Sequence, residues 1–379
     1  MSVGVRIAIV GPIHPIRGGI ALYTARLAAA ARERGHEVEV LSYRRLYPRL
    51  FFPGRTQLDP DPAPALLAGL RVEASLDSLS PASWVRAASR LARGRPELVA
   101  LQRWHPFFAP ALATVARAAR RGGARVVWLV HNARPHEGRS LPWGPLLRLG
   151  LHLDDRALVH ASSEAEALRS LGVRCPIRST PMPAPEVPRE VLDPAVARRS
   201  FGIDPGDVVF LFLGYVRAYK GVDVLVEALR RLAPEGPRWS ALVLGEWYVD
   251  RSWADRAAAA PPLAGRLRIV DRYAGEEEVA RALAAATVAV LPYRWGSQSA
   301  VVPLCFAHGR GVVTTRVGGL PEAIEHGVSG LLVEPGDAAA LAEALEEIRR
   351  GRRFAPAALE RARARMGFPA LVETLEELC

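Results

Sequence analysis

The sequence predicts an α/β protein made of two doubly wound, Rossmann-like domains, and three observations lead to that prediction. Short apolar runs typical of buried parallel strands alternate with amphipathic helical patterns along nearly the whole chain. This series occurs twice, from about residue 5 to 161 and again from 208 to 333. Between the two series lies the stretch TPMPAPEVPREVLDP, which indicates an extended linker because proline fixes the backbone and cannot donate a hydrogen bond.

The first series begins with a strand, a glycine loop and a helix. The run VRIAIVGP predicts a strand over 5–11, Gly18 and Gly19 form the loop, and an amphipathic helix is expected over 20–34. Further strands of this series are expected at 38–43, 97–102, 125–130 and 157–161. The strands of the second series are expected at 208–214, 240–245, 267–270, 288–291, 311–315 and 331–333.

These patterns divide the 379 residues into an N-terminal domain over 1–180, a linker over 181–194 and a C-terminal domain over 195–355. A single amphipathic helix is expected over 356–379, where it could pack back on the N-terminal domain. We expect the two domains to face each other across a cleft. Sheets of this kind bind ligands beyond the carboxyl ends of their strands, so the cleft is the expected site.

Charge is unevenly distributed along the chain. Residues 1–190 hold 27 arginines against 15 acidic residues, a net charge of +12, whereas residues 191–379 hold 23 basic and 24 acidic residues, a net charge of −1. This asymmetry favours an anionic partner for the N-terminal half, such as a membrane face, a phosphorylated acceptor or a nucleic acid. The alternative is a compositional drift towards arginine and alanine.

The sequence contains no signal-peptide pattern and no window of about 18 uninterrupted apolar residues that could cross a bilayer. Its cysteines, Cys175, Cys305 and Cys379, lie far apart and show no metal-ligand spacing. We therefore expect a cytoplasmic protein with neither a bound metal nor a cofactor.

Two cations follow the first strand of the second series, in the stretch GYVRAYKGVDVLVEALRRL from Gly214. Arg217 and Lys220 lie on a short loop between a strand and a helix, where they would offset the charge of a diphosphate leaving group. The spacing differs from the Walker pattern, which disfavours a P-loop ATPase. The alternative is a helix start with solvated cations.

A second polar loop follows the strand at 288–291. Ser297, Gln298 and Ser299 precede an apolar helix, whose first amides could bind phosphate or sugar oxygens. A tight turn at Gly318-Gly319 opens another helix shortly afterwards. Ser297 could equally be a plain helix cap.

These two stretches, in this order and separation, resemble the C-terminal domain of retaining glycosyltransferases of the GT-B fold, family four (glycosyltransferase group 1). The resemblance covers nearly the whole chain and implies transfer of a sugar from a nucleotide-diphosphate donor. By this resemblance Lys220 and Arg217 are catalytic residues on the diphosphate. The donor-binding residues that it implies in this domain are Tyr273, Gln298, Ser299, Ala300, Val301 and Gly319.

The N-terminal half carries the same resemblance. PIRGGIALYTARL is similar to the family's glycine loop, which implies that Gly18 and Gly19 lie close to the donor phosphates. VHNARPHEG is similar to the segment that supplies a histidine near the reacting sugar, which makes His131 the third catalytic residue, with His136 and Glu137 in the loop that positions it. A lone histidine at a strand end can also be purely structural.

The chain departs from the family pattern at three positions. The family commonly has two glutamates eight positions apart, and alignment through VVTTRVGGLPE places Gly296 and Leu304 there. An arginine that usually follows the glycine of the cation loop is Tyr215 here. The chain most resembles a subset with a Gln-Ser pair in the donor-sugar loop.

The segment RRLYPRLFFPGR, Arg44 to Arg55, interleaves arginines with aromatic and aliphatic residues. Such a segment would suit weak binding to the headgroups of an anionic membrane. Phe51 and Phe52 could equally pack against the domain.

The function expected from these observations is metal-independent, retaining transfer of a sugar from a UDP- or GDP-sugar to a glycan or lipid-linked acceptor. Such acceptors are typical of polysaccharide and cell-envelope synthesis, and would place the protein peripherally on the inner face of the membrane. A non-catalytic GT-B module that binds a nucleotide sugar or glycan is the main alternative, and an epimerase of the same fold is another. Nucleic acid is not an expected partner, because charge alone supports it and no reading element is present.

Overall fold

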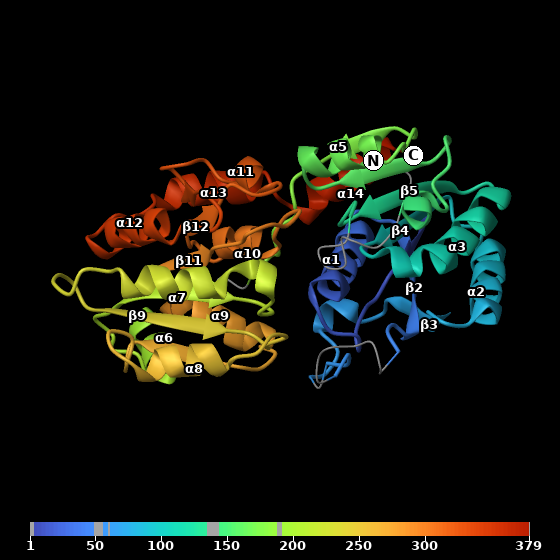
Figure 1. Cartoon of the computed structure of the whole chain (residues 1–379). Helices are drawn as coiled ribbons and strands as arrows, with labels where there is room; N and C mark the ends of the chain where they lie inside the picture. Colours follow the sequence, from blue (N-terminus) through green and yellow to red (C-terminus); the bar gives the residue numbers. More distant parts are fainter. Residues whose placement is uncertain (1–3, 49–55, 60, 135–143, 188–191, 379) are drawn as a thin grey trace. The chain divides into compact units, whose positions relative to one another are not determined.

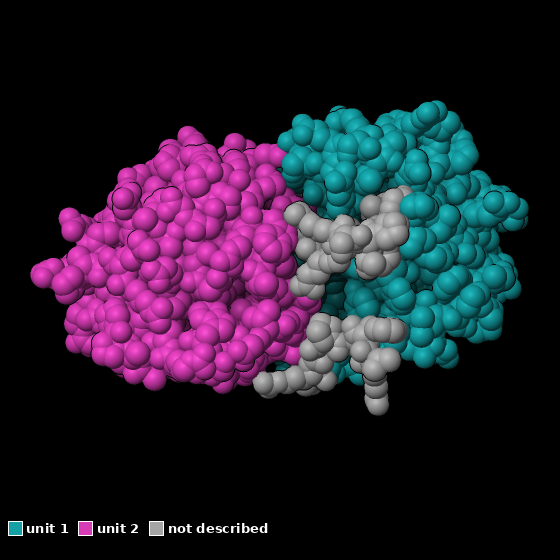
Figure 2. Space-filling view, viewed as in Figure 1, with its two compact units in different colours: residues 1–181, 367–379 teal, residues 182–366 magenta. Residues whose placement is uncertain are grey.

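The computed structural model describes residues 4–48, 56–59, 61–134, 144–187 and 192–378. The chain forms two compact units, residues 1–181 with 367–379 (unit 1) and residues 182–366 (unit 2), which Figure 2 colours separately. Each unit is a parallel sheet flanked by helices (Figure 1). The predicted α/β class with two Rossmann-like folds is therefore confirmed.

Unit 1 contains a seven-stranded parallel sheet. Its strands are β1 (Arg6–Val10), β2 (Glu37–Arg45), β3 (Arg71–Asp77), β4 (Leu98–Arg103), β5 (Arg125–Val130), β6 (Arg156–Val159) and β7 (Ile177–Ser179). The strand order is β3-β2-β1-β4-β5-β6-β7, so the direction of winding reverses between β1 and β4. In doubly wound sheets this reversal point is where ligands bind.

The helices of unit 1 include one from the far end of the sequence. They are α1 (Gly19–Glu33), α2 (Pro81–Gly94), α3 (Ala109–Arg121), α4 (Gly144–Arg148), α5 (Ser162–Ser170) and α14 (Phe368–Glu377). In Figure 1, α14 lies among the elements of unit 1, and it packs against α1. Arg34, which follows α1, donates two hydrogen bonds of 2.9 and 2.8 Å to the carboxylate of Glu376. The end of the chain is therefore part of the N-terminal unit.

Unit 2 contains a six-stranded parallel sheet. Its strands are β8 (Val208–Leu213), β9 (Trp239–Leu244), β10 (Leu267–Val270), β11 (Val288–Leu291), β12 (Val312–Thr315) and β13 (Gly330–Val333). Their order is β10-β9-β8-β11-β12-β13, so winding reverses between β8 and β11. The helices of the unit are α6 (Pro194–Ser200), α7 (Val222–Arg230), α8 (Ser252–Ala259), α9 (Glu276–Ala285), α10 (Val301–Ala307), α11 (Leu320–Ala323), α12 (Ala338–Arg349) and α13 (Pro356–Ala364).

The central strands are buried and largely apolar because helices cover both faces of each sheet. Every residue of β4, β8 and β9 is buried. Within the described ranges no helix is long and apolar enough to cross a membrane.

The structure corrects three sequence expectations. Strand β3, RVEASLD, was not predicted because it is a half-exposed edge strand rich in charged residues. The edge strand β7 was also missed, because it has only three residues and two of them are exposed. The single helix expected over 356–379 is two helices, α13 and α14, which belong to different units and are separated at Met366-Gly367.

Candidate functional site

The loop after β8 carries the two predicted cations to the point where winding reverses in unit 2. The chain leaves β8 at Leu213 and makes a single 3-10 turn over Ala218–Lys220 before α7 begins. Gly221 between them has φ 68°, and a Cβ atom there would lie 2.0 Å from the carbonyl oxygen of Pro292. Glycine is required at this position because the loop closes directly on the end of β11.

Lys220 folds back over the carboxyl end of β8. Its Nζ atom lies 5.3 Å from the centre of the Tyr293 ring, and a Cβ atom on Gly214 would come within 3.2 Å of it. Burial of the ammonium group, and then the charge of Arg217, lower the pKa of Lys220 to about 8. The enclosed ammonium therefore lies where a bound anion would stabilise its charge.

Three tyrosines stack beside the cations, at the ends of β8, β9 and β10. The Tyr215 ring lies 5.1 Å from that of Tyr248 at an interplanar angle of 16°, and 6.2 Å from that of Tyr273 at 29°. The guanidinium of Arg217 lies 4.5 Å from the centre of the Tyr248 ring. The predicted residues Arg217 and Tyr273 thus belong to one aromatic cluster, which also contains Tyr215 and Tyr248. Tyr248 was not predicted, although an aromatic pair, Trp247-Tyr248, shortly after a buried strand was a signal for it.

The predicted donor-sugar loop lies at the end of β11. Both amide atoms of Gln298 are buried and have no hydrogen-bond partner in the described part of the chain. An unsatisfied buried amide is costly, and a ligand that offers a donor and an acceptor would remove that cost. Gln298 is therefore placed as a ligand contact would be.

Ser299 has a local structural partner instead. Its Oγ atom accepts a hydrogen bond of 3.2 Å from the backbone N–H of Val301 and lies 3.2 Å from the Tyr293 hydroxyl. Ser299 therefore satisfies the first N–H of α10, a helix of seven residues that begins at Val301 and has Ala300 at its N-cap position.

The glycine turn after β12 packs on the same loop. A Cβ atom on Gly318, whose φ is 51°, would lie 2.2 Å from the carbonyl oxygen of Gly296, and the N–H of Gly319 donates to Ser297 O over 2.6 Å. Leu304, at the other position of the missing glutamate pair, packs against the core of unit 2. The second glutamate position is thus occupied by a packing residue.

Gly18, Gly19 and His131 belong to unit 1. Gly18 directly precedes α1, and a Cβ atom on Gly19 would meet nothing within 4 Å, so this loop leaves open space beside the backbone. His131 follows β5 and is buried, and its Nε2 atom lies 2.8 Å from Oε1 of Gln102. Burial, and then the neighbouring His160, lower the pKa of His131 to about 3, which keeps the imidazole neutral. Residues 135–143, with His136 and Glu137, lie outside the described residues.

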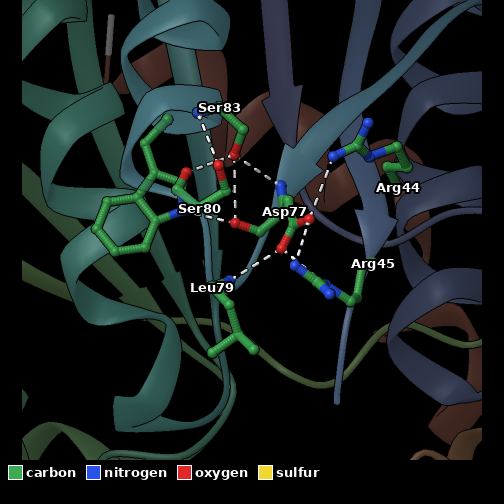
Figure 3. Close-up of polar contacts among 7 residues, drawn as sticks. Arg44, Arg45, Asp77, Leu79, Ser80 and Ser83 are labelled. Carbon is green, nitrogen blue, oxygen red and sulfur yellow. Dashed lines mark hydrogen bonds and ion pairs between the residues drawn. The ribbon is translucent and has the colours of Figure 1, made fainter. Parts of the chain in front are cut away.

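The described part of the basic Arg44–Arg55 segment is engaged with unit 1. Arg44 and Arg45 both form ion pairs with the buried carboxylate of Asp77 at the end of β3 (Figure 3). Burial alone would raise the pKa of Asp77, but hydrogen bonds from the Leu79 N–H and from the two arginines outweigh it and lower the pKa. The Tyr47 ring packs on Phe108 at 5.2 Å rather than projecting outward. Residues 49–55 lie outside the described residues, so Arg49, Phe51, Phe52 and Arg55 are not placed.

The described ranges contain no group of three or more His, Cys, Asp or Glu side chains arranged to hold a metal ion.

Both halves of the chain match known protein families. Residues 207–350 match the model described as "Glycosyl transferases group 1", and residues 17–183 match the model described as "Glycosyltransferase Family 4". The fold agrees with solved structures over nearly the whole chain. The complex of Anabaena HepE with UDP has a TM-score of 0.74 at 17% identity, covering 98% of each chain, and a sucrose-phosphate synthase from Thermosynechococcus elongatus has 0.75 at 19%, covering 99% of this chain and 98% of that one.

These findings define a GT-B fold, and each half of the chain is similar to a glycosyltransferase family, residues 207–350 to group 1 and residues 17–183 to family 4. Among curated relatives, a D-inositol 3-phosphate glycosyltransferase from Mycobacterium sp. (strain KMS) is 30% identical over 59% of this chain and 52% of its own length. A D-inositol 3-phosphate glycosyltransferase 2 from Catenulispora acidiphila is 34% identical over 57% of this chain and 53% of its own length. The matches thus span about half of the length of these relatives.

Proposed function

We propose that the protein transfers a sugar from a nucleotide-diphosphate donor, with retention of configuration, to a glycan or lipid-linked acceptor. The observation that carries the proposal is the arrangement at the winding reversal of unit 2. There the enclosed ammonium of Lys220, the guanidinium of Arg217 and the unsatisfied amide of Gln298 follow neighbouring strands. These groups offer two cations to a diphosphate and an amide to sugar hydroxyls.

The tyrosine cluster supports a nucleotide as the leaving group. Tyr215, Tyr248 and Tyr273 offer aromatic faces to a base beside the cations, because stacking favours flat ring systems. HepE, which shares this fold, has been solved with UDP and with UDP-glucose, so a UDP-sugar is the first donor to test.

In unit 1, the neutral His131 would contact the reacting sugar, and the Gly18-Gly19 backbone would approach the donor phosphates. Catalysis would require no divalent ion, since Lys220 and Arg217 supply the positive charge that a metal supplies elsewhere.

The direct test of donor binding is a thermal-shift measurement on the whole chain with UDP-sugars, GDP-sugars, UDP and GDP. A ligand that binds only the native state raises the melting temperature, and the stabilisation grows with the logarithm of one plus the ratio of ligand concentration to Kd. We expect one nucleotide family to raise it. The proposal is overturned if none of these ligands shifts the melting temperature at millimolar concentration.

We further propose that the acceptor is anionic and that unit 1 binds it. The net charge of +12 over residues 1–190 supports this, and so do the exposed side chains of Arg44 and Arg45, which together exceed the charge of their partner Asp77 by one. A lipid-linked acceptor would bring the protein to an anionic membrane surface. Salt-sensitive cosedimentation with anionic liposomes tests this, and absence of binding at low salt would favour a soluble phosphorylated acceptor, such as inositol 3-phosphate.

A second candidate function is binding of a nucleotide sugar without transfer. The observation that favours it is the absence of both family glutamates, with Gly296 at one position and Leu304, which packs against the core, at the other. Release of nucleoside diphosphate, with the sugar passing to water or to an added phosphorylated acceptor, separates the two candidates, since a binding module would raise its melting temperature with the donor but release nothing.

A further inference from the structure

A chain of buried polar side chains links helix α1 to His131 in unit 1. The Nε2 atom of Gln102 lies 2.5 Å from Oγ1 of Thr24, and the Oε1 atom of Gln102 lies 2.8 Å from Nε2 of His131. Thr24 and Gln102 are both fully buried. Three separate elements, α1, β4 and the end of β5, therefore contribute to one hydrogen-bonded series.

The backbone of α1 fixes the direction of every hydrogen bond in this series. The hydroxyl of Thr24 donates to the carbonyl oxygen of Ile20 over 2.9 Å, so its oxygen acts as an acceptor towards Gln102. The amide NH₂ of Gln102 must then face Thr24, and its oxygen must face His131. Because an amide oxygen only accepts, the Nε2 atom of His131 must carry a proton.

Gln102 has little freedom to turn away from this arrangement. A Cβ atom on Gly11, which follows β1, would lie 3.1 Å from both Cδ and Nε2 of Gln102. The side chain is thus held against the backbone of Gly11 on one side and by Thr24 and His131 at its two ends.

Two ring neighbours of His131, Tyr23 and His160, are compatible with a neutral imidazole. The Tyr23 ring from α1 meets it edge to face at 4.7 Å, and His160 from the end of β6 lies 6.0 Å away. The Nδ1 atom of His160 lies 3.2 Å from the carbonyl oxygen of Thr180 and its Nε2 atom 2.9 Å from the Tyr23 hydroxyl. His160 therefore donates to Thr180 and accepts from Tyr23, and neither neighbour supplies a negative charge that would favour an imidazolium.

We propose that Gln102 is a positioning residue that holds His131 as the neutral Nε2–H tautomer, so that Nδ1 is the acceptor nitrogen of the ring. Thr24 orients Gln102, and through it the helix that follows the Gly18-Gly19 loop orients the histidine. Resting on the proposed function, this means that a hydrogen bond made through Nδ1 to a hydroxyl of the reacting sugar is one that His131 accepts. A sugar lacking that hydroxyl would lose this contact.

The tautomer can be measured directly by nitrogen NMR of the ring in the whole protein labelled at histidine, with a His131→Gln variant to assign the signal. We expect protonated Nε2 and unprotonated Nδ1 for His131 at pH 7. In Thr24→Val the acceptor for the Gln102 amide is lost, so we expect a mixture of tautomers and about a 10- to 100-fold loss of transfer. Thr24→Ser retains the hydroxyl and should preserve both the spectrum and the rate.

Gln102→Glu gives an independent readout, because a carboxylate facing Nε2 favours the imidazolium and raises the pKa of His131. In this variant the ring should gain its second proton at a higher pH than in the native protein, and transfer should decline as pH falls through that value. A protonated Nδ1 in the native protein, or an unchanged tautomer in folded Thr24→Val, would overturn the proposal. If the tautomers behave as expected but His131→Gln transfers sugar at the native rate, then Gln102 does position His131, and the proposed role of His131 in transfer fails.

Discussion

Two polar side chains in unit 2 are destabilised in the free protein in a way that a bound donor would relieve. The ammonium of Lys220 is enclosed beside Gly214 and Tyr293, and the amide of Gln298 is buried without a partner in the described part of the chain. Such unfavourable placements are common at binding sites, where the ligand supplies the missing interactions. Each placement leads to a measurable consequence.

The lowered pKa of Lys220 predicts that affinity for the nucleoside diphosphate depends on pH. Below about pH 8 Lys220 of the free protein carries the ammonium that we propose binds the diphosphate, and above that pH the cation is progressively lost. The diphosphate is already fully ionised in this range, because the second pKa of a phosphate is about 6. Calorimetric titration between pH 7 and 9.5 should therefore show affinity falling by up to about tenfold per pH unit above 8. Lys220→Ala should bind weakly with no such decline, and a flat native profile would contradict this assignment.

Gln298→Met should stabilise the free protein and weaken binding of the sugar. Methionine has a similar length and no polar atoms, so removing two unsatisfied buried atoms should add about 1 kcal/mol to the free energy of unfolding. Affinity for the nucleotide sugar should fall, while affinity for the nucleoside diphosphate should not change. A Gln298→Met variant that is less stable than native, or that loses affinity for both ligands equally, would show that the amide has another role.

At the scale of elements, α14 is held on α1 by charge as well as by packing. Glu376 accepts two hydrogen bonds from Arg34, and its carboxylate lies 2.7 Å from Nε2 of the buried His36. The bonds from Arg34 outweigh partial burial, and with the bond to His36 they lower the pKa of Glu376 to about 2. This carboxylate therefore favours the folded state above its ordinary pKa of 4.5, and its contribution is lost as pH falls from there towards 2.

Glu376→Gln should consequently reduce the free energy of unfolding by about 1 kcal/mol at pH 7, with a smaller difference from native at pH 3. Glu373→Gln is the matched control. Glu373 makes a single contact of 2.9 Å with the same arginine and its side chain is 56% exposed, so its loss should matter less. Equal effects of the two substitutions in chemical denaturation would argue against a special role for Glu376.

The place of each element in its sheet also decides whether the element could be predicted from the sequence. Central strands were recognisable because a buried parallel strand is a continuous apolar run, whereas β3 and β7 lie at sheet edges and lack that pattern. The cation loop was recognisable because its signals are adjacent in sequence. Gln102 was not, since its partners Thr24 and His131 are 78 and 29 residues away and meet it only through the order of the strands. Tyr215 was interpreted as the loss of an arginine, and its stacking with Tyr248 was unforeseen.

At the scale of the whole molecule, the Gly18-Gly19 loop of unit 1 and the cation loop of unit 2 each follow a strand at which the winding of its own sheet reverses, and His131 follows β5, one strand beyond the reversal in unit 1. In unit 2, Asp223 lies in the first turn of α7, the helix that follows the cation loop. Its carboxylate accepts a hydrogen bond of 2.7 Å from Arg294, so it is not a free carboxylate beside the cations. We therefore predict that transfer survives chelation with EDTA, since protein cations stabilise the leaving diphosphate. Loss of transfer on chelation, reversed by adding magnesium, would contradict this account of the site.

The central claim is that the protein transfers sugar from a nucleoside-diphosphate sugar whose diphosphate is held by Lys220. Release of the nucleoside diphosphate tests this claim most directly. The measurement compares native protein, Lys220→Ala and Arg230→Ala, with the donor that gives the largest thermal shift and with water or added inositol 3-phosphate as the acceptor of the sugar. Arg230 is the control because it is an exposed cation on α7, the helix that follows the cation loop. The account predicts native release for Arg230→Ala and about a 10²- to 10³-fold lower rate for folded Lys220→Ala, as for loss of one preorganised electrostatic contact. Native release by Lys220→Ala, or no release by native protein with any donor that binds, would contradict it.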